Sequence, residues 1–123
     1  MVQIPIRNRN KPTFLKIDFD SIQLYQSLVE IWNSRSEVVL KQNVGMTTSN
    51  EFRLPDFNNE NTYYMVLIKT VISIITPDAL NTYALEVSFI QDKEIICHNS
   101  IKGQFEKDKN LGVVAFVGKV YVE

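Results

Sequence analysis

The chain has 123 residues, of which 45% are hydrophobic and 22% charged, with 13 basic and 14 acidic side chains and a formal net charge of −1. This length and balance are typical of a single globular domain. The near-zero charge excludes a strong overall field that would attract nucleic acid or anionic lipid. The single cysteine, Cys97, excludes an internal disulfide and a multi-cysteine zinc site.

The N-terminal apolar run is too short, and is interrupted too soon by Arg7 and Arg9, to be a secretory signal. The longest apolar stretch, residues 63–75, contains Lys69 and falls short of the ~20 residues that a membrane helix needs. We therefore expect no signal peptide, no transmembrane segment and a location in the cytoplasm or a virion. The 13 Ile and 11 Asn against 3 Ala indicate an AT-rich coding sequence, as in a low-GC bacterium, its phage or a large virus.

Residues 1–12 form the first segment, and we predict an extended N-terminal arm. Arg7, Arg9 and Lys11 occur with no acidic residue before Asp18, and the asparagines and Pro12 between them disfavour regular structure. A frayed terminus, an arm that docks on a neighbouring subunit and a contact with nucleic acid all fit this pattern. We assign the three basic residues as candidate partner-binding residues.

Residues 13–33 combine two patterns. Residues 13–19 alternate as a β-strand does. The following apolar positions have helical spacing, with Asp20 and Gln23 as a potential capping box: they are Tyr25, Leu28, Val29 and Trp32. We predict a short α-helix over residues 21–33, with a strand over residues 28–32 as the alternative, because Val, Ile and Trp suit a sheet.

Residues 43–61 are predicted to be one long loop after a strand at residues 37–42. Long loops inside compact domains are often functional. Phe52, Leu54 and Phe57 either pin this loop onto the core like a lid or form exposed aromatic contacts for a partner. We assign Phe52, Arg53 and Phe57 as candidate partner-binding residues.

Residues 62–123 form a series of strands, and residues 83–89 have the clearest alternation of apolar and polar side chains. Residues 63–75 are long for one strand, so we expect a bend or bulge around Lys69, with the strand serving two sheets. Residues 82–91 and 94–105 are predicted to form a hairpin. Residues 113–122 are apolar on both sides, which indicates a strand covered on both faces.

The fold class that fits these segments is mainly β. We predict a single domain over residues 13–123, built as a two-sheet antiparallel β-sandwich of about seven or eight strands with the short helix near residues 21–33. Both a jelly-roll and an immunoglobulin-like topology suit the strand count. The sequence contains no internal repeat.

Catalytic motifs are lacking in the sequence. Cys97 and His98 are adjacent on a predicted strand, so their side chains point to opposite faces and cannot pair. Asp18 and Asp20 could ligate Ca²⁺ with Asp56 or Asp78, but no calcium-loop motif accompanies them. The four scattered glycines form no phosphate-binding loop. We therefore expect no enzymatic activity, no metal and no cofactor.

These observations favour a non-enzymatic structural or assembly protein, most specifically a virion component such as a capsid, decoration, tail or adaptor subunit of a phage or virus. Its partners would be copies of itself or other assembly subunits. The alternative is a sandwich that binds carbohydrate or a host protein through Phe52, Phe57 and Tyr63 beside the asparagines of residues 58–61. The charge balance argues against nucleic acid as the partner.

Overall fold

The computed structural model describes residues 1–20, 23–46, 50–74, 81–106 and 109–123, and within these ranges every regular element is a β-strand. No helix occurs in them, whereas a short helix was predicted. The strands are β1 (Val2–Ile6), β2 (Thr13–Phe19), β3 (Leu24–Asn33), β4 (Val38–Gly45), β5 (Glu51–Arg53), β6 (Tyr63–Ser73), β7 (Thr82–Gln91), β8 (Glu94–Gln104) and β9 (Leu111–Val122).

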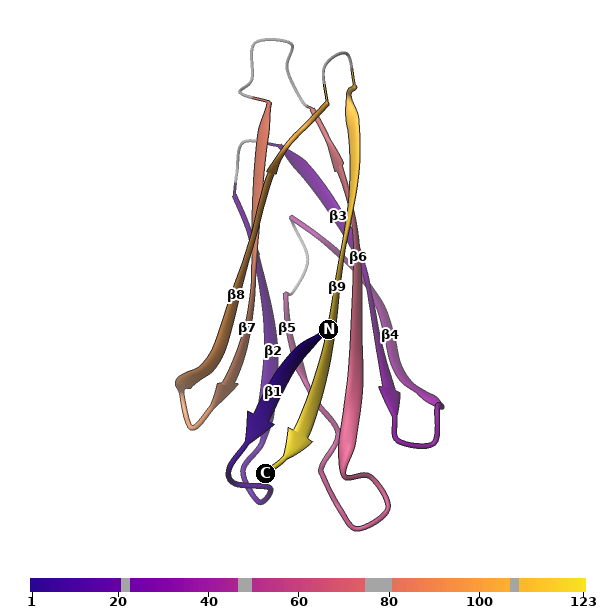
Figure 1. Cartoon of the computed structure of the whole chain (residues 1–123), viewed down its shortest axis with the longest axis vertical. Helices are drawn as coiled ribbons and strands as arrows, with labels where there is room; N and C mark the ends of the chain where they lie inside the picture. The colour runs from indigo at the N-terminus through magenta and orange to yellow at the C-terminus, as the bar shows by residue number, and fades with distance from the viewer. Residues whose placement is uncertain (21–22, 47–49, 75–80, 107–108) are drawn as a thin grey trace.

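The strands form two sheets that lie face to face in an elongated, sandwich-like arrangement (Figure 1). One sheet has five strands in the order β1-β9-β6-β3-β4, and the other has four in the order β5-β2-β7-β8. The prediction of a mainly β fold with two sheets is confirmed. The pairing is antiparallel throughout except between β1 and β9, which run parallel.

The predicted helix over residues 21–33 is wrong, because β3 is a strand from Leu24 to Asn33. Its residues alternate, with Tyr25 and Val29 inside the sandwich and Leu28 and Trp32 on the outer side. Both sides are apolar, so the alternation that marks a strand was hidden and a helical spacing appeared by coincidence. The proposed cap residue Asp20 instead accepts a hydrogen bond from the hydroxyl of Tyr25.

The first residues of the predicted arm belong to the domain itself. β1 pairs with β9 from Val2 opposite Gly118 to Ile6 opposite Val122, and the side chains of Ile4 and Ile6 are fully buried. Residues 7–12 connect β1 to β2. In this structure, therefore, residues 2–6 are an edge strand of the five-stranded sheet and not a free extension.

Two further expectations change with the structure. The segment 43–61 is not one loop, since β4 extends to Gly45 and β5 lies within it. β6 belongs to the five-stranded sheet alone and keeps an unbroken register with β3 and β9 past Lys69, so the expected bend there is wrong. The register shifts of the described strands lie instead between Ile31 and Trp32 and between Phe89 and Ile90. The predicted hairpin is confirmed as β7 and β8.

The core between the sheets is apolar and contains a few hydrogen bonds. Tyr25 of β3 accepts a hydrogen bond from the backbone N–H of Ala84 on β7 at 3.1 Å, which joins the two sheets. Ser27 and Thr70 hydrogen-bond to each other at 2.7 Å in the buried layer. These contacts satisfy polar groups that would otherwise be costly to bury.

Candidate interaction surface

The outer side of the five-stranded sheet is mainly apolar, and we call it the apolar face. On β3, β6 and β9 the inward side chains are buried, so their neighbours along each strand point to solvent. The apolar residues on this side are Leu24, Leu28 and Trp32 of β3, Val38 of β4, Tyr63, Met65, Leu67 and Val71 of β6, and Leu111, Val113, Ala115, Val117 and Tyr121 of β9.

Several of these side chains are strongly exposed. Val113 is 67% exposed, Leu111 58% and Leu24 54%. The prediction that residues 113–122 are covered on both faces is therefore wrong for the outer face in this structure. Only the inner face, with Phe116 and Val120, is covered. Within one chain, nothing that the structure describes covers this side of β9.

Strand register makes the apolar face continuous. Across β6 and β9, Val71 lies opposite Val113 and Leu67 opposite Val117. Four strands at ~4.8 Å spacing and ~3.3 Å rise per residue give this whole side, with its polar and charged residues included, an area on the order of 700 Å². The largest apolar patch on a typical monomer is about 300–600 Å², and patches at or above that size mark interaction sites.

The apolar face contains a depression of about 380 Å³ between β3, β6 and β9. It lies at the end of the face where β3 ends and β6 begins. Trp32, Tyr63 and Met65 line it, and the indole N–H of Trp32 donates to a carboxylate oxygen of Glu30 at 3.1 Å. The ammonium of Lys119 lies 4.7 Å from the centre of the Tyr63 ring, in a cation–π contact. Trp and Tyr held in this way are the residues that most often dominate binding at protein interfaces.

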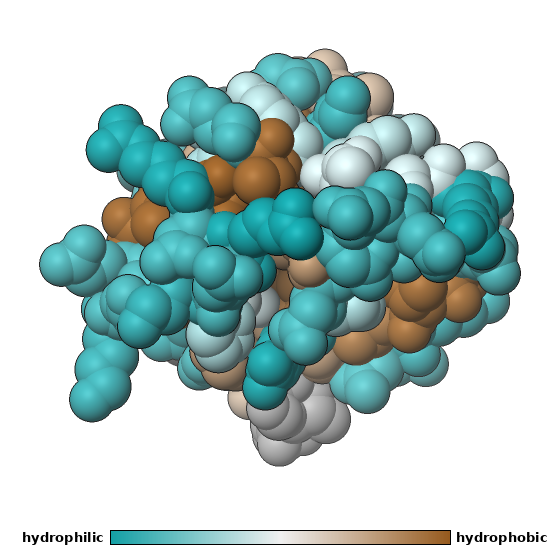
Figure 2. Space-filling model, turned by 90° about the horizontal axis from the view of Figure 1, so that it is seen from below, coloured by the Kyte–Doolittle hydropathy of each residue, from teal (hydrophilic) through white to brown (hydrophobic). Residues whose placement is uncertain are grey.

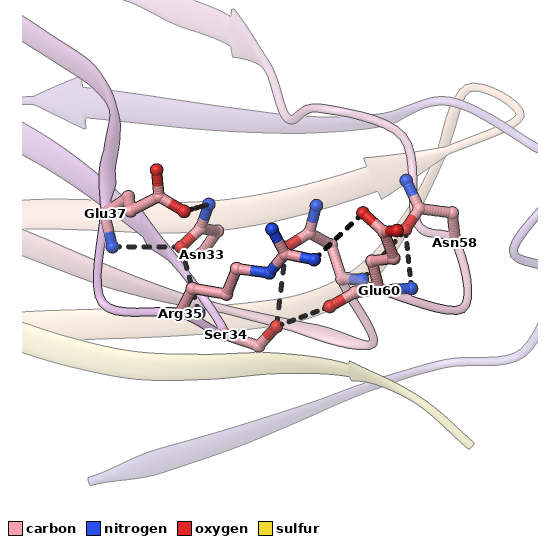
Figure 3. Close-up of polar contacts among 7 residues, drawn as sticks. Asn33, Ser34, Arg35, Glu37, Asn58 and Glu60 are labelled. Carbon is pink, nitrogen blue, oxygen red and sulfur yellow. Dashed lines mark hydrogen bonds and ion pairs between the residues drawn. The ribbon is translucent and has the colours of Figure 1, made fainter.

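A polar cluster fixes the loops beside the depression (Figure 3). Arg35 in the β3–β4 turn forms an ion pair with Glu60 at 3.0 Å, and the hydroxyl of Ser34 donates to the backbone carbonyl of Glu60 at 2.8 Å. The amide oxygen of Asn33 accepts from the backbone N–H groups of Arg35 and Glu37. The turn and the loop before β6 are thus connected by hydrogen bonds and an ion pair beside the depression.

The charges on the apolar face are unequal. Its basic side chains are Lys41, Lys69 and Lys119, and its only acidic side chain among the residues that the structure describes is Glu30. The face is therefore positive although the chain as a whole is not. A complementary surface would be apolar and would carry carboxylates.

The three basic residues predicted to bind a partner lie in the β1–β2 connection. Arg7 lies 3.9 Å from a carboxylate of Glu123, and Lys11 lies 3.5 Å from Asp92. Arg9 donates to the side chain of Asn59 at 3.4 Å. This end of the molecule is mainly hydrophilic, with separate hydrophobic areas (Figure 2). Such exposed pairs contribute little to stability. Arg7, Arg9 and Lys11 are accessible, but each contacts a different partner and they do not form one common site.

The aromatic residues predicted to bind a partner lie in the core. Phe52 and Phe57 are each only 7% exposed, and the ring of Phe57 packs edge-on against Tyr64 with centroids 5.1 Å apart. Arg53 is exposed and pairs with Asp56 at 3.2 Å. The rings of Phe52 and Phe57 are therefore not available to a partner or a sugar in this structure, and they pin residues 52–57 onto the sandwich.

The residues considered for chemistry remain apart. Cys97 faces inward and His98 outward, as predicted, and burial raises the pKa of the Cys97 thiol. His98 lies 3.6 Å from Glu86 on the outer side of the four-stranded sheet. No group of three or more metal-ligating side chains occurs within the described ranges, and the candidate ligand Asp78 lies outside them.

Comparisons with known proteins give no relationship. No protein-family model, no curated protein and no solved structure matches this chain. In the part of the chain that the structure describes, no helix is long and apolar enough to cross a membrane.

Proposed function

We propose that this chain is a non-enzymatic structural or assembly protein that docks on a neighbouring subunit through its apolar face. The observation that carries the proposal is the exposure of many apolar side chains on the outer side of the five-stranded sheet. Leaving that side in water has a cost of about 25 cal/mol per Å² relative to covering it. A partner that covers it recovers this free energy.

The features of the face support a protein partner. A flat sheet surface with an aromatic depression at one end suits another protein surface better than it suits a small ligand, which needs an enclosed cavity. The excess of lysines over the single glutamate favours a partner surface with carboxylates at the margin of its apolar area.

A virion component is the particular assembly that we propose. It is supported by the AT-rich residue usage, with 13 Ile and 11 Asn, and by the small size of the domain. A jelly-roll or immunoglobulin-like sandwich, the closer description of the fold, belongs to the same proposal.

The test is the mass of the complex that contains the full chain when it is isolated from its native source. Val71→Glu places a charge on the apolar face, and Ser100→Glu places one on the outer side of the four-stranded sheet as the matched control. We expect the wild type and Ser100→Glu to be isolated in a complex, and Val71→Glu to be isolated without it. A Val71→Glu chain that remains in the complex would contradict the proposal.

A further inference from the structure

The edge of β9 is only partly used. β1 pairs with residues 118–122, whereas β6 pairs with residues 111–121 on the other side. No strand in the described part of the chain pairs with residues 111–117 on the β1 side. A seven-residue length of strand edge, from Leu111 to Val117, thus presents backbone N–H and C=O groups without a neighbouring strand.

The other edges of the two sheets carry protection that this segment lacks. β8 has Lys102 and a register shift, and β4 has Lys41 and a register shift. β5 is three residues long and β1 is short and contains Pro5. Charges, bulges, short strands and proline are the devices that prevent edge-to-edge pairing. The segment 111–117 has no charge, no proline and no register shift.

The surroundings of this edge leave space beside it. A depression of about 320 Å³ is lined by Leu111, Gly112 and Val113 together with Tyr83 and Phe105. The side chain of Val113 is the most exposed of the strand at 67%. β1 shows that the same edge of β9 accepts a strand, because Ile4 becomes fully buried when β1 pairs there.

We propose that residues 111–117 pair antiparallel with the same residues of a second copy of the chain. A two-fold axis at Val114 places Val113 of one copy opposite Ala115 of the other, and Leu111 opposite Val117. These pairs contain no like charges, and each joins apolar side chains on the outer side. The contact is isologous and therefore closes as a dimer.

The dimer would join the two five-stranded sheets into one continuous sheet. β1 of each copy pairs with residues 118–122, so it lies in line with the added strand. Met1, which precedes β1, and the partner's Asn110 would have to turn out of the sheet for residues 111–117 to pair over their whole length. The two apolar faces would then form one surface with twice the number of strands. This inference concerns the edge of the sheet and does not depend on the proposed docking of the apolar face.

The test uses two full-length variants with opposite charges at the paired positions. One carries Val113→Glu and Ala115→Glu, and the other carries Val113→Lys and Ala115→Lys. Both positions are exposed, so folding is expected to be retained, and circular dichroism checks it. Sedimentation velocity over a range of concentrations measures the mass of the wild type, of each variant alone and of their equimolar mixture.

We expect the wild type to form a dimer and each variant alone to dimerise at least roughly tenfold more weakly, because like charges face each other. The mixture should recover the dimer, since Glu then faces Lys. A wild type that stays monomeric up to millimolar concentration overturns the proposal, and so does a mixture that stays monomeric.

Val71→Glu separates this proposal from docking through the apolar face. Val71 lies opposite Val113 on β6, one strand away from the edge. The edge dimer should survive Val71→Glu. If Val71→Glu abolishes the dimer, the dimer forms through the face and the edge proposal is wrong. Amide hydrogen exchange gives a second readout: alternate N–H groups of residues 111–117 should become protected only at concentrations where the dimer forms.

Discussion

The two outer sides of this sandwich face the same solvent and yet differ in composition. On the four-stranded sheet, Lys16 and Asp18 lie 3.9 Å apart, and His98 lies 3.6 Å from Glu86. On the five-stranded sheet, the corresponding rows hold mainly Val, Leu, Trp and Tyr, with three lysines and Glu30 among them. The exposed large apolar residues of the four-stranded sheet are Ile95 and Ile96 on β8, within the part of the chain that the structure describes. Since both inner sides pack the same core, folding alone does not require this difference. This difference is the basis of the proposal that the five-stranded side docks on a partner.

The comparison is tested most strongly by removing an inward ring. Phe57→Ala should lower the free energy of unfolding by about 3–5 kcal/mol, because a buried ring that packs against Tyr64 is lost. Urea denaturation measures the change. A cost below about 1 kcal/mol would mean that the ring contributes little to the core and is free for a partner, as the sequence analysis suggested.

The next effect concerns the hydrogen bond between Tyr25 and Ala84, which joins the two sheets. Tyr25→Phe removes a hydroxyl that donates to Asp20 and accepts from the N–H of Ala84. Both partners would be left without it, so we expect a loss of about 1–3 kcal/mol in urea denaturation. Tyr121→Phe is the matched control, since the Tyr121 hydroxyl bonds to no residue that the structure describes, and it should cost far less.

The same tyrosine predicts a dependence on pH. Burial, and next the hydrogen bond to Asp20, raise the pKa of Tyr25 above its ordinary value of 10.0. The folded state therefore holds the phenol proton more tightly than the unfolded state does. This contribution is fully present below pH 10 and is lost as the pH rises above it. Unfolding measured from neutral to alkaline pH should show a smaller decline for Tyr25→Phe than for the wild type.

A smaller effect is expected at the depression on the apolar face. Glu30→Gln keeps the shape of the side chain but weakens the hydrogen bond from the Trp32 indole. We expect a loss of about 0.5–1 kcal/mol in stability and a shift in the fluorescence emission of Trp32, the single tryptophan of the chain. Unchanged emission would mean that this pair does not form in solution.

The smallest effect on stability sharpens the comparison most. Val113→Ser, on the outer side, should change the free energy of unfolding of the monomer by no more than about 0.5 kcal/mol, because in the monomer the side chain is already in water. The measurement is made at a concentration at which the chain is monomeric. Phe57→Ala serves as the buried counterpart measured in the same denaturation series. A cost above 2 kcal/mol for Val113→Ser would show that the outer side stabilises the monomer, and would remove the reason for a partner.

The sequence predicted the sheets far better than it predicted the site. Alternation over residues 83–89 identified β7 because one side of that strand is apolar and the other polar. The same rule failed for β3, where Leu28 and Trp32 lie on an apolar outer side. The apolar face was visible in residues 113–122, but a strand that is apolar on both sides looks the same whether its own chain or another subunit covers it. Phe52 and Phe57 were misassigned because a three-residue strand and the short segment after it are too short for periodicity to separate a lid from a binding loop.

The parallel pairing of β1 with β9 has a consequence for the order of folding. Val2 pairs with Gly118, so this contact cannot form until the chain has been synthesised through residue 118. Hairpins such as β7 and β8 join neighbours in sequence and close early, whereas contacts of long sequence separation pay their loop entropy late. Until then, Ile4 and Ile6 are not buried by pairing with β9. While it is unpaired, this strand exposes apolar side chains to other nascent copies, and a chaperone would bind it at this stage.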